Sequence, residues 1–206
     1  MYPGEKFNSI THLIGAALSI AGTSVLITLA YVGGDHLKII SSIIYGTTLI
    51  FLYSISTIYH SIPGPHKKLF QKLDHLAIYL LIAGSYTPFT MVSLHNHEWG
   101  WWLFGINWVL AICGIIFELT LSHKTRIPSL VIYIVMGWLV VTVIKSLLVA
   151  LSIPGFILLA SGGVLYTGGI IFYLFDEKIK HFHGIWHLFV MGGSITQYLC
   201  VLLYVI

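Results

Sequence analysis

The chain has 206 residues, of which 57% are hydrophobic and only 8% are charged. A soluble fold of this size could not cover its surface with so few charges without leaving large apolar patches in water. The composition therefore excludes a secreted enzyme and a cytosolic domain. The formal net charge of +3 is too small for a nucleic-acid-binding surface. Histidine is the unusual residue, with 11 copies against 10 Lys and Arg together.

Seven apolar stretches are long enough to cross a bilayer, which takes about 20 residues per helix. The sequence predicts an all-α fold, a seven-transmembrane helix bundle that forms a single domain over residues 1–206. The seven predicted spans are Ile10–Val32, Ile39–Ile62, Leu73–Ser93, Trp101–Leu121, Pro128–Ala150, Ile153–Phe175 and Gly184–Ile206.

The break between the fifth and sixth spans is the least obvious, because it carries almost no charge. Residues 128–175 are too long for one span, and Pro154 and Gly155 interrupt the apolar run. Proline removes a backbone donor and clashes with the preceding helical turn. We therefore place the break near Leu151 and Ser152.

The basic residues predict the orientation of the bundle. Eight of the ten Lys and Arg residues fall on the side of the N-terminus, and only Lys38 and Lys145 fall on the other side. Lys and Arg are enriched in cytoplasmic loops. We expect a multi-pass protein of the cell (plasma) membrane with a cytoplasmic N-terminus and an external C-terminus.

The histidines gather at one end of the predicted bundle. Eight lie at the cytoplasmic face, and the remaining three are His36, His95 and His97 on the other. Ionisable groups at membrane depth are costly and usually face the bundle interior or a cavity. The cytoplasmic histidines are His12, His60, His66, His75, His123, His181, His183 and His187.

Helical spacing selects three of these histidines as candidate metal ligands. His183 and His187 are four residues apart, so both imidazoles face one side of the seventh span, as in helical zinc sites. His60, at the inner end of the second span, is a plausible third ligand at the same depth. Three histidines and one open position are typical of catalytic zinc, which activates a bound water near neutral pH. Imidazole also suits other transition metals.

Two further residues are candidate catalytic groups. Asp74 lies one short loop after His60, at the same depth, where it could orient the water or act as general base. Ser56 precedes His60 by one helical turn and could donate a hydrogen bond to a ligand, the water or a developing oxyanion. The alternative for Asp74 is an N-cap of the third span.

The other cytoplasmic histidines have a simpler interpretation. His66, His75, His123 and His181 are expected to be interfacial, helix-capping or loop residues, because the imidazole ring is amphipathic. The pair His95 and His97 has metal-like spacing, but we expect it to be solvent-exposed on the opposite face.

Four motifs occur together along the chain. In order they are Glu5-x-x-Asn8-x-x-Thr11-His12, Ser56-x-x-x-His60, Asp74-His75 with Gly84-Ser85-x-x-Pro88, and His183-x-x-Trp186-His187. With these motifs the chain resembles bacterial hemolysin III-type proteins of the progestin and adiponectin receptor (PAQR) family. The resemblance covers essentially the whole chain.

The resemblance implies a zinc site near the cytoplasmic face, with His60, His183 and His187 as ligands. It also implies that Asp74 contacts the metal through water and that Ser56 lies beside the site. The adiponectin receptor branch has been linked to ceramide hydrolysis, and the bacterial branch carries a hemolysin name and links to membrane-lipid homeostasis. The long cytoplasmic N-terminal region of the eukaryotic receptors is missing here, so hormone reception is not expected.

The N-terminal motif leaves two interpretations open. Glu5, Asn8, Thr11 and His12 could form a polar network beside the site, or tie the first span to the seventh. They could equally cap the first helix at the interface.

Three functions compete on this evidence. The first is a zinc-dependent hydrolase (ceramidase-like) of lipid amide or ester bonds, whose substrate is a membrane lipid entering from the bilayer. The second is a non-enzymatic membrane sensor or signalling protein with a structural zinc. The third is a cytolytic pore-forming protein. The sequence argues against the third, because seven apolar spans with inward positive charge describe a protein inserted by its own cell. A channel is less attractive, since the polar groups gather at one face.

Overall fold

A computed structural model describes residues 4–120 and 126–206, and every regular element in them is helical. Leu121, His123 and Lys124, which the sequence placed at the end of the fourth span and in the following loop, lie outside the described residues. The elements are α1 Lys6–Val32, α2 His36–Ser61, α3 Lys67–Pro88, η1 Phe89–Ser93, α4 Glu98–Thr120, α5 Ile127–Trp138, η2 Leu139–Val143, α6 Ile144–Phe175 and α7 Phe182–Tyr204.

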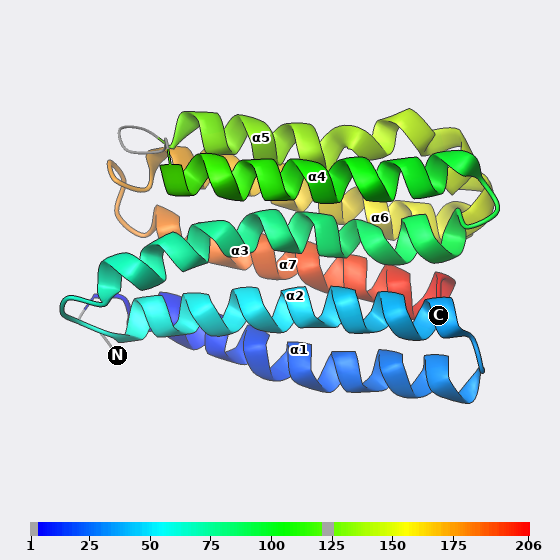
Figure 1. Cartoon of the computed structure of the whole chain (residues 1–206). Helices are drawn as coiled ribbons and strands as arrows, with labels where there is room; N and C mark the ends of the chain where they lie inside the picture. Colours follow the sequence, from blue (N-terminus) through cyan, green and yellow to red (C-terminus); the bar gives the residue numbers. More distant parts are fainter. Residues whose placement is uncertain (1–3, 121–125) are drawn as a thin grey trace.

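Six of the described helical segments are long and apolar enough to cross a membrane. They lie side by side in an elongated bundle, with the two chain ends at opposite ends of it (Figure 1). Many large apolar side chains point outward, such as Leu18, Ile112 and Val164. Such a surface suits lipid and not water, because exposed apolar area is unfavourable only in water.

The longest of these segments, Ile127–Phe175, is interrupted as the sequence predicted. Ser152 has φ of 58° and ψ of 169°, which no helix contains, and Pro154 follows two residues later. α6 then runs back alongside α5 in the opposite direction (Figure 1). The predicted break near Leu151 and Ser152 is therefore confirmed, and its cause is the backbone conformation of Ser152 together with the missing amide hydrogen of Pro154.

The third helix begins earlier than its apolar pattern indicates. It starts at Lys67, directly after the Pro63–Pro65 turn, whereas the apolar run was expected to begin at Leu73. Its first turns carry Lys67, Lys68 and Lys72, so hydropathy marks only the part of the helix inside lipid. Asp74 consequently lies two turns inside α3, and the alternative that it caps this helix is wrong.

Glycines bring α6 and α7 into close contact. A Cβ at Gly169 would lie 2.9 Å from atoms of Phe189 and Trp186, and one at Gly193 would lie 2.9 Å from the Tyr166 ring. A Cβ at Gly162 would lie 2.7 Å from Gln197. Small residues allow helix backbones to approach closely in membranes. This contact fixes the depth of α7 against α6, and therefore the position of the histidines at the start of α7.

Candidate metal centre

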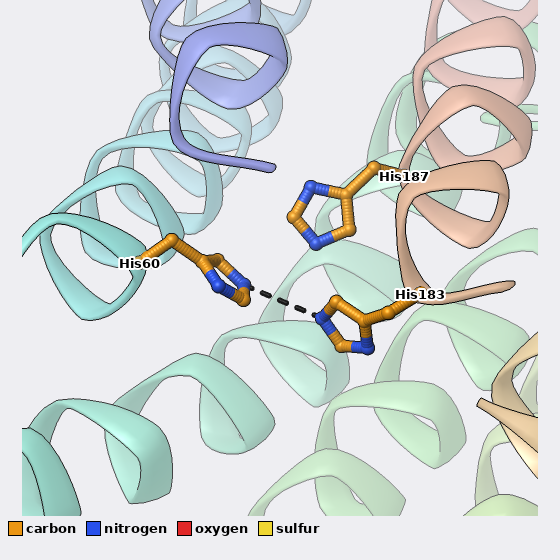
Figure 2. A group of neighbouring side chains, drawn as sticks. All are labelled: His60, His183 and His187. Carbon is orange, nitrogen blue, oxygen red and sulfur yellow. Dashed lines mark hydrogen bonds between the residues drawn. The ribbon is translucent and has the colours of Figure 1, made fainter. Parts of the chain in front are cut away.

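His60, His183 and His187 come together at the end of the bundle that also holds the N-terminus. His60 lies in the last turn of α2, and His183 and His187 lie in the first turns of α7. The three imidazoles point into the space between these helices (Figure 2). Their ring centroids are 5.1, 4.8 and 4.9 Å apart. One ligand nitrogen from each lies within 4.8 Å of the other two, so the group could hold a metal ion.

The outward-facing nitrogen of each histidine has a partner. Nδ1 of His60 lies 2.7 Å from a Glu5 carboxylate oxygen, and Nδ1 of His183 lies 2.6 Å from a carboxylate oxygen of Asp176. Nδ1 of His187 lies 3.5 Å from the Thr11 hydroxyl. An ionised carboxylate can only accept a hydrogen bond. The ring hydrogen of His60 and that of His183 therefore lie on Nδ1. Their Nε2 lone pairs then face inward, which is the tautomer a metal requires.

The distance between the inward-facing nitrogens fits a tetrahedral ion. Nε2 of His60 and Nε2 of His183 are 3.4 Å apart. Zinc–nitrogen bonds of about 2.0–2.1 Å at a tetrahedral angle place two ligand nitrogens about 3.3–3.4 Å apart. Two lone pairs at this separation repel each other unless a proton or a metal cation lies between them. The donor set, the tautomers and the spacing therefore fit a transition metal such as zinc.

Each supporting carboxylate is held in turn by a cation from another segment of the chain. Lys67 Nζ lies 3.1 Å from Glu5, and Arg126 Nη2 lies 3.0 Å from Asp176. Burial alone would raise the pKa of Asp176, but its bonds to His183 and Arg126 outweigh burial and hold this pKa below its ordinary value. Asp176 is thus an anion beside His183. Glu5, Lys67, Arg126 and Asp176 bring four separate chain segments to the histidines.

The histidines open onto a polar cavity of about 780 Å³. Ser56 and Asp74 line this cavity, and the Ser56 hydroxyl hydrogen-bonds the Asp74 carboxylate. The structure therefore brings all five candidate residues to one cavity. Ser56 is 1% exposed and His60 is 2% exposed, so this part of the site is shielded from bulk solvent.

A second, almost wholly apolar cavity of about 250 Å³ adjoins the first inside the bundle. Ser85, which belongs to the motif of the third span, lines this second cavity. The polar cavity and the apolar cavity are thus neighbours inside the bundle. The residues that line both cavities are Leu52, Ile78, Tyr133, Trp186 and Val190.

The N-terminal motif contributes to the site and not to a helix cap. Glu5 occupies the N-cap position of α1, but its side chain makes no capping bond. Asn8 and His12 line the polar cavity, and the His12 ring stacks on the His187 ring at 3.7 Å. The interpretation that this motif ties α1 to α7 is therefore confirmed by the stacked rings of His12 and His187, and the capping alternative is wrong.

His75 lies inside α3, so it neither caps a helix nor lies in a loop, and its place in the site was not predicted. The sequence indicated an interfacial or capping residue, whereas the structure places it on the wall of the polar cavity. Its Nδ1 lies 3.3 Å from the carboxylate of Glu118 on α4. This partner is far away in the sequence, so no local pattern around His75 reveals it.

The remaining described histidines agree better with their expected roles. His66 and His181 occupy the N-cap positions of α3 and α7, although neither side chain makes a capping bond. His95 and His97 are exposed, and Nδ1 of His95 bonds the backbone carbonyl of Val92. Their metal-like spacing therefore carries no site among the described residues.

Sequence reasoning missed Asp176, Arg126 and Glu118 as parts of the site. A general signal was present, because only 8% of the residues are charged. In a membrane protein such rare ionisable residues usually mark a functional site. Asp176 and Arg126 lie outside the helices, and their segments meet the histidines at the end of the bundle that holds the N-terminus.

The chain resembles several known proteins over most of its length. The chain is 48% identical to "Hemolysin-3" of Bacillus cereus over 203 residues, covering 98% of this chain and 92% of that protein. It is 44% identical to the "Hemolysin-3 homolog" of Bacillus subtilis (strain 168), covering 97% and 93%. It is 29% identical to the human "Monocyte to macrophage differentiation factor", covering 94% and 81%.

The family model described as "Haemolysin-III related" matches residues 2–198. This match covers nearly all of the chain and includes every residue of the candidate site. A membrane family and several apolar helices describe a multi-pass protein of the plasma membrane. The chain belongs to the haemolysin-III related family.

Proposed function

We propose that this protein is a zinc-dependent hydrolase of lipid amide or ester bonds that acts in membrane-lipid homeostasis. The observation that carries the proposal is the position of the three histidines. Their inward-facing nitrogens lie on the wall of a polar cavity that adjoins an apolar one inside the bundle. A lipid has the same two parts, a polar head with a carbonyl group and an apolar chain.

His60, His183 and His187 would hold the ion, each through one ring nitrogen. A bound zinc ion supplies a Lewis acid that polarises a carbonyl and brings the pKa of water near neutrality. The Asp74 carboxylate lies in the same cavity and acts as the proton acceptor when water adds to the carbonyl carbon. The Ser56 hydroxyl bonds this carboxylate, and so orients it toward the water.

The apolar cavity is the place for the hydrocarbon chain of the substrate. Its volume of about 250 Å³ lies between α3, α5, α6 and α7, and its wall is formed mainly by Leu, Ile and Val. Burying each CH₂ group of the chain there contributes about 0.8 kcal/mol to the free energy of binding. Such a chamber would draw a lipid from the bilayer sideways and place its carbonyl at the polar cavity.

We further propose that the whole chain forms one domain with seven membrane crossings, a cytoplasmic N-terminus and an external C-terminus. The reversal of direction at Ser152 and the position of the chain ends at opposite ends of the bundle support seven crossings. The metal site then faces the cytoplasm. Reporter fusions at the C-terminus and at the loop after α4 test this topology, and reporters on the same side of the membrane would contradict it.

The decisive experiment for hydrolysis uses the purified full-length protein in lipid nanodiscs with bound zinc. Ceramides, N-acyl amides and acyl esters of different chain lengths are supplied, and free fatty acid is measured by mass spectrometry. We expect wild-type turnover that disappears with His60→Ala and after chelation. The matched control is His97→Ala, an exposed histidine at the other end of the bundle. Absence of turnover on every substrate by the zinc-loaded protein would overturn the proposal.

A structural ion in a membrane sensor is the second candidate. It is favoured by one observation, namely that the ligands join α2 to α7, which are 123 residues apart at His60 and His183. In this case Asp74 has no chemical role. An Asp74→Asn variant that binds zinc and keeps full biological activity would select the sensor over the hydrolase.

A further inference from the structure

A second group of polar side chains occupies the same cavity as the metal-binding histidines. It consists of His75 on α3, Glu118 on α4, Ser129 on α5 and Tyr173 on α6, all of which line the cavity. None of these four residues belongs to the metal-binding set. We call them the His75 group.

Glu118 is the buried anchor of the His75 group. Its side chain is 8% exposed, one carboxylate oxygen lies 3.3 Å from Nδ1 of His75, and the other accepts a hydrogen bond from the Ser129 hydroxyl. An ionised carboxylate at membrane depth is costly unless it is well paired. The structure therefore places this carboxylate where it orients one particular imidazole.

His75 itself is fixed at three points and remains accessible. Besides the bond from Nδ1 to Glu118, its backbone carbonyl accepts a hydrogen bond of 2.9 Å from the Tyr133 hydroxyl. Its Nε2 lies 3.4 Å from the Tyr173 hydroxyl. The side chain is nevertheless 27% exposed, and it lines the cavity. An imidazole with one nitrogen on a carboxylate and the other free to exchange partners is the arrangement of a proton carrier.

Tyr173 joins this group to the metal-binding histidines. Its hydroxyl contacts Nε2 of His75, and its ring centroid lies 6.3 Å from that of His183. The guanidinium of Arg126 lies over the Tyr173 ring at 4.5 Å and also binds Asp176, the partner of His183. One tyrosine thus separates His75 from the metal-binding set, so a single polar head could contact both.

We propose that His75 is the catalytic proton donor to the leaving group, and that Glu118 positions it. This role rests on the proposed hydrolysis of a lipid amide or ester. Asp74 and His75 are adjacent in the sequence but have different partners, Ser56 for Asp74 and Glu118 for His75. Two acid–base groups held in different surroundings are what cleavage of a poor leaving group needs, one to accept a proton and one to donate it.

The proton balance of the step is complete with these two groups. Water adds to the amide carbon and gives one proton to Asp74. The carbon–nitrogen bond then breaks, the oxygen electron pair restores the carbonyl, and the nitrogen takes the Nε2 proton of doubly protonated His75. The products are a carboxylic acid and a neutral amine, and the proton on Asp74 returns to His75 through water in the cavity.

The test compares two leaving groups in the same nanodisc-embedded, zinc-loaded protein. One substrate is an acyl amide of an alkylamine, which leaves only when protonated, and the other is an acyl ester of a nitrophenol, which leaves without a proton. His75→Gln should lower amide hydrolysis about 100-fold or more, and lower ester hydrolysis less than about 10-fold. Glu118→Gln should also lower amide hydrolysis more than ester hydrolysis, but by a smaller factor than His75→Gln. His97→Gln is the matched control, and zinc content and melting temperature are measured for every variant.

Three results would overturn the proposal in distinguishable ways. Equal losses on both substrates, in either variant, mean that the His75 group only supports the fold or the metal site. Full amide activity in His75→Gln means that the proton comes from elsewhere. A wild-type protein that hydrolyses neither substrate overturns the hydrolase function itself, and the role of His75 with it. If His75→Gln does not fold, the selectivity of Glu118→Gln decides.

Discussion

Nδ1 of His60 lies 2.7 Å from the carboxylate of Glu5, although the two residues are 55 positions apart. The contact assigns the ring hydrogen of His60 to the outer nitrogen and leaves the inner nitrogen free to bind a metal. Asp176 does the same for His183 at 2.6 Å. The two carboxylates therefore belong to the candidate metal centre, although each lies on the outer side of its imidazole.

We predict that Glu5→Gln and Asp176→Asn each weaken zinc binding about 10- to 100-fold. The amide loses the charge that fixes the imidazole, but it keeps the size of the side chain. The measurement is a competition titration of the purified variant with a zinc-binding dye. Glu98→Gln, an exposed position at the opposite end of the bundle, is the control. Unchanged affinity in both variants would show that the carboxylates only tie loops together.

We predict that zinc stabilises the folded protein and that the histidines are required for this effect. A ligand at 100 times its dissociation constant adds about 2.7 kcal/mol to the free energy of unfolding. The melting temperature of the wild type in detergent should rise with zinc and fall with a chelator. His183→Ala should respond to neither. A variant that still gains the full shift would place the ion elsewhere.

We predict that Asp74→Asn separates metal binding from turnover. The amide cannot accept a proton from water, so hydrolysis should fall about 100-fold or more. Zinc content should stay the same, because the three ligands are histidines. Metal analysis and the fatty-acid assay are made on one sample. Loss of zinc together with activity would instead make Asp74 a ligand.

We predict that a single methyl group at the α6–α7 contact destabilises the bundle. In Gly169→Ala the added Cβ lies 2.9 Å from side-chain atoms of Phe189 and Trp186, so these side chains or the two helices must shift. We expect a cost of about 1–3 kcal/mol in the free energy of unfolding. Gly163→Ala, in the same helix, meets nothing within 4 Å and should be neutral or slightly stabilising. Thermal melting of both variants in detergent gives the comparison. Similar melting temperatures would mean that the contact is looser than the structure shows.

Local pattern was enough to predict most of the helices. Apolar runs of bilayer length located them, and Pro154 located the break that the structure places at Ser152. The pattern failed at the start of α3, because Lys67 and Lys68 are helical but lie outside the apolar part. Hydropathy reports on the solvent around a helix, and it does not report where the backbone hydrogen bonds begin.

The candidate site was likewise predictable only in part. The pair His183 and His187 follows from helical spacing, which places both side chains on one face. Their meeting with His60 was predicted from shared depth alone, and the 3.4 Å between two ring nitrogens bears it out. No such rule links His75 to Glu118, because the contact depends on which helices are neighbours in the bundle.

The sequence by itself determined that the chain lies in lipid, that it is helical, and that its histidines gather at one end. These properties depend on composition and on spacing along the chain, which each helix carries alone. Only the tertiary structure decided which carboxylate faces which histidine, that Glu5 belongs to the site, and that His75 lines the cavity. Apart from the contact of Asp176 with His183, which are neighbours along the chain, those contacts join helices distant in the sequence. They exist only once close packing such as that of Gly169 against α7 has set the depth of every helix.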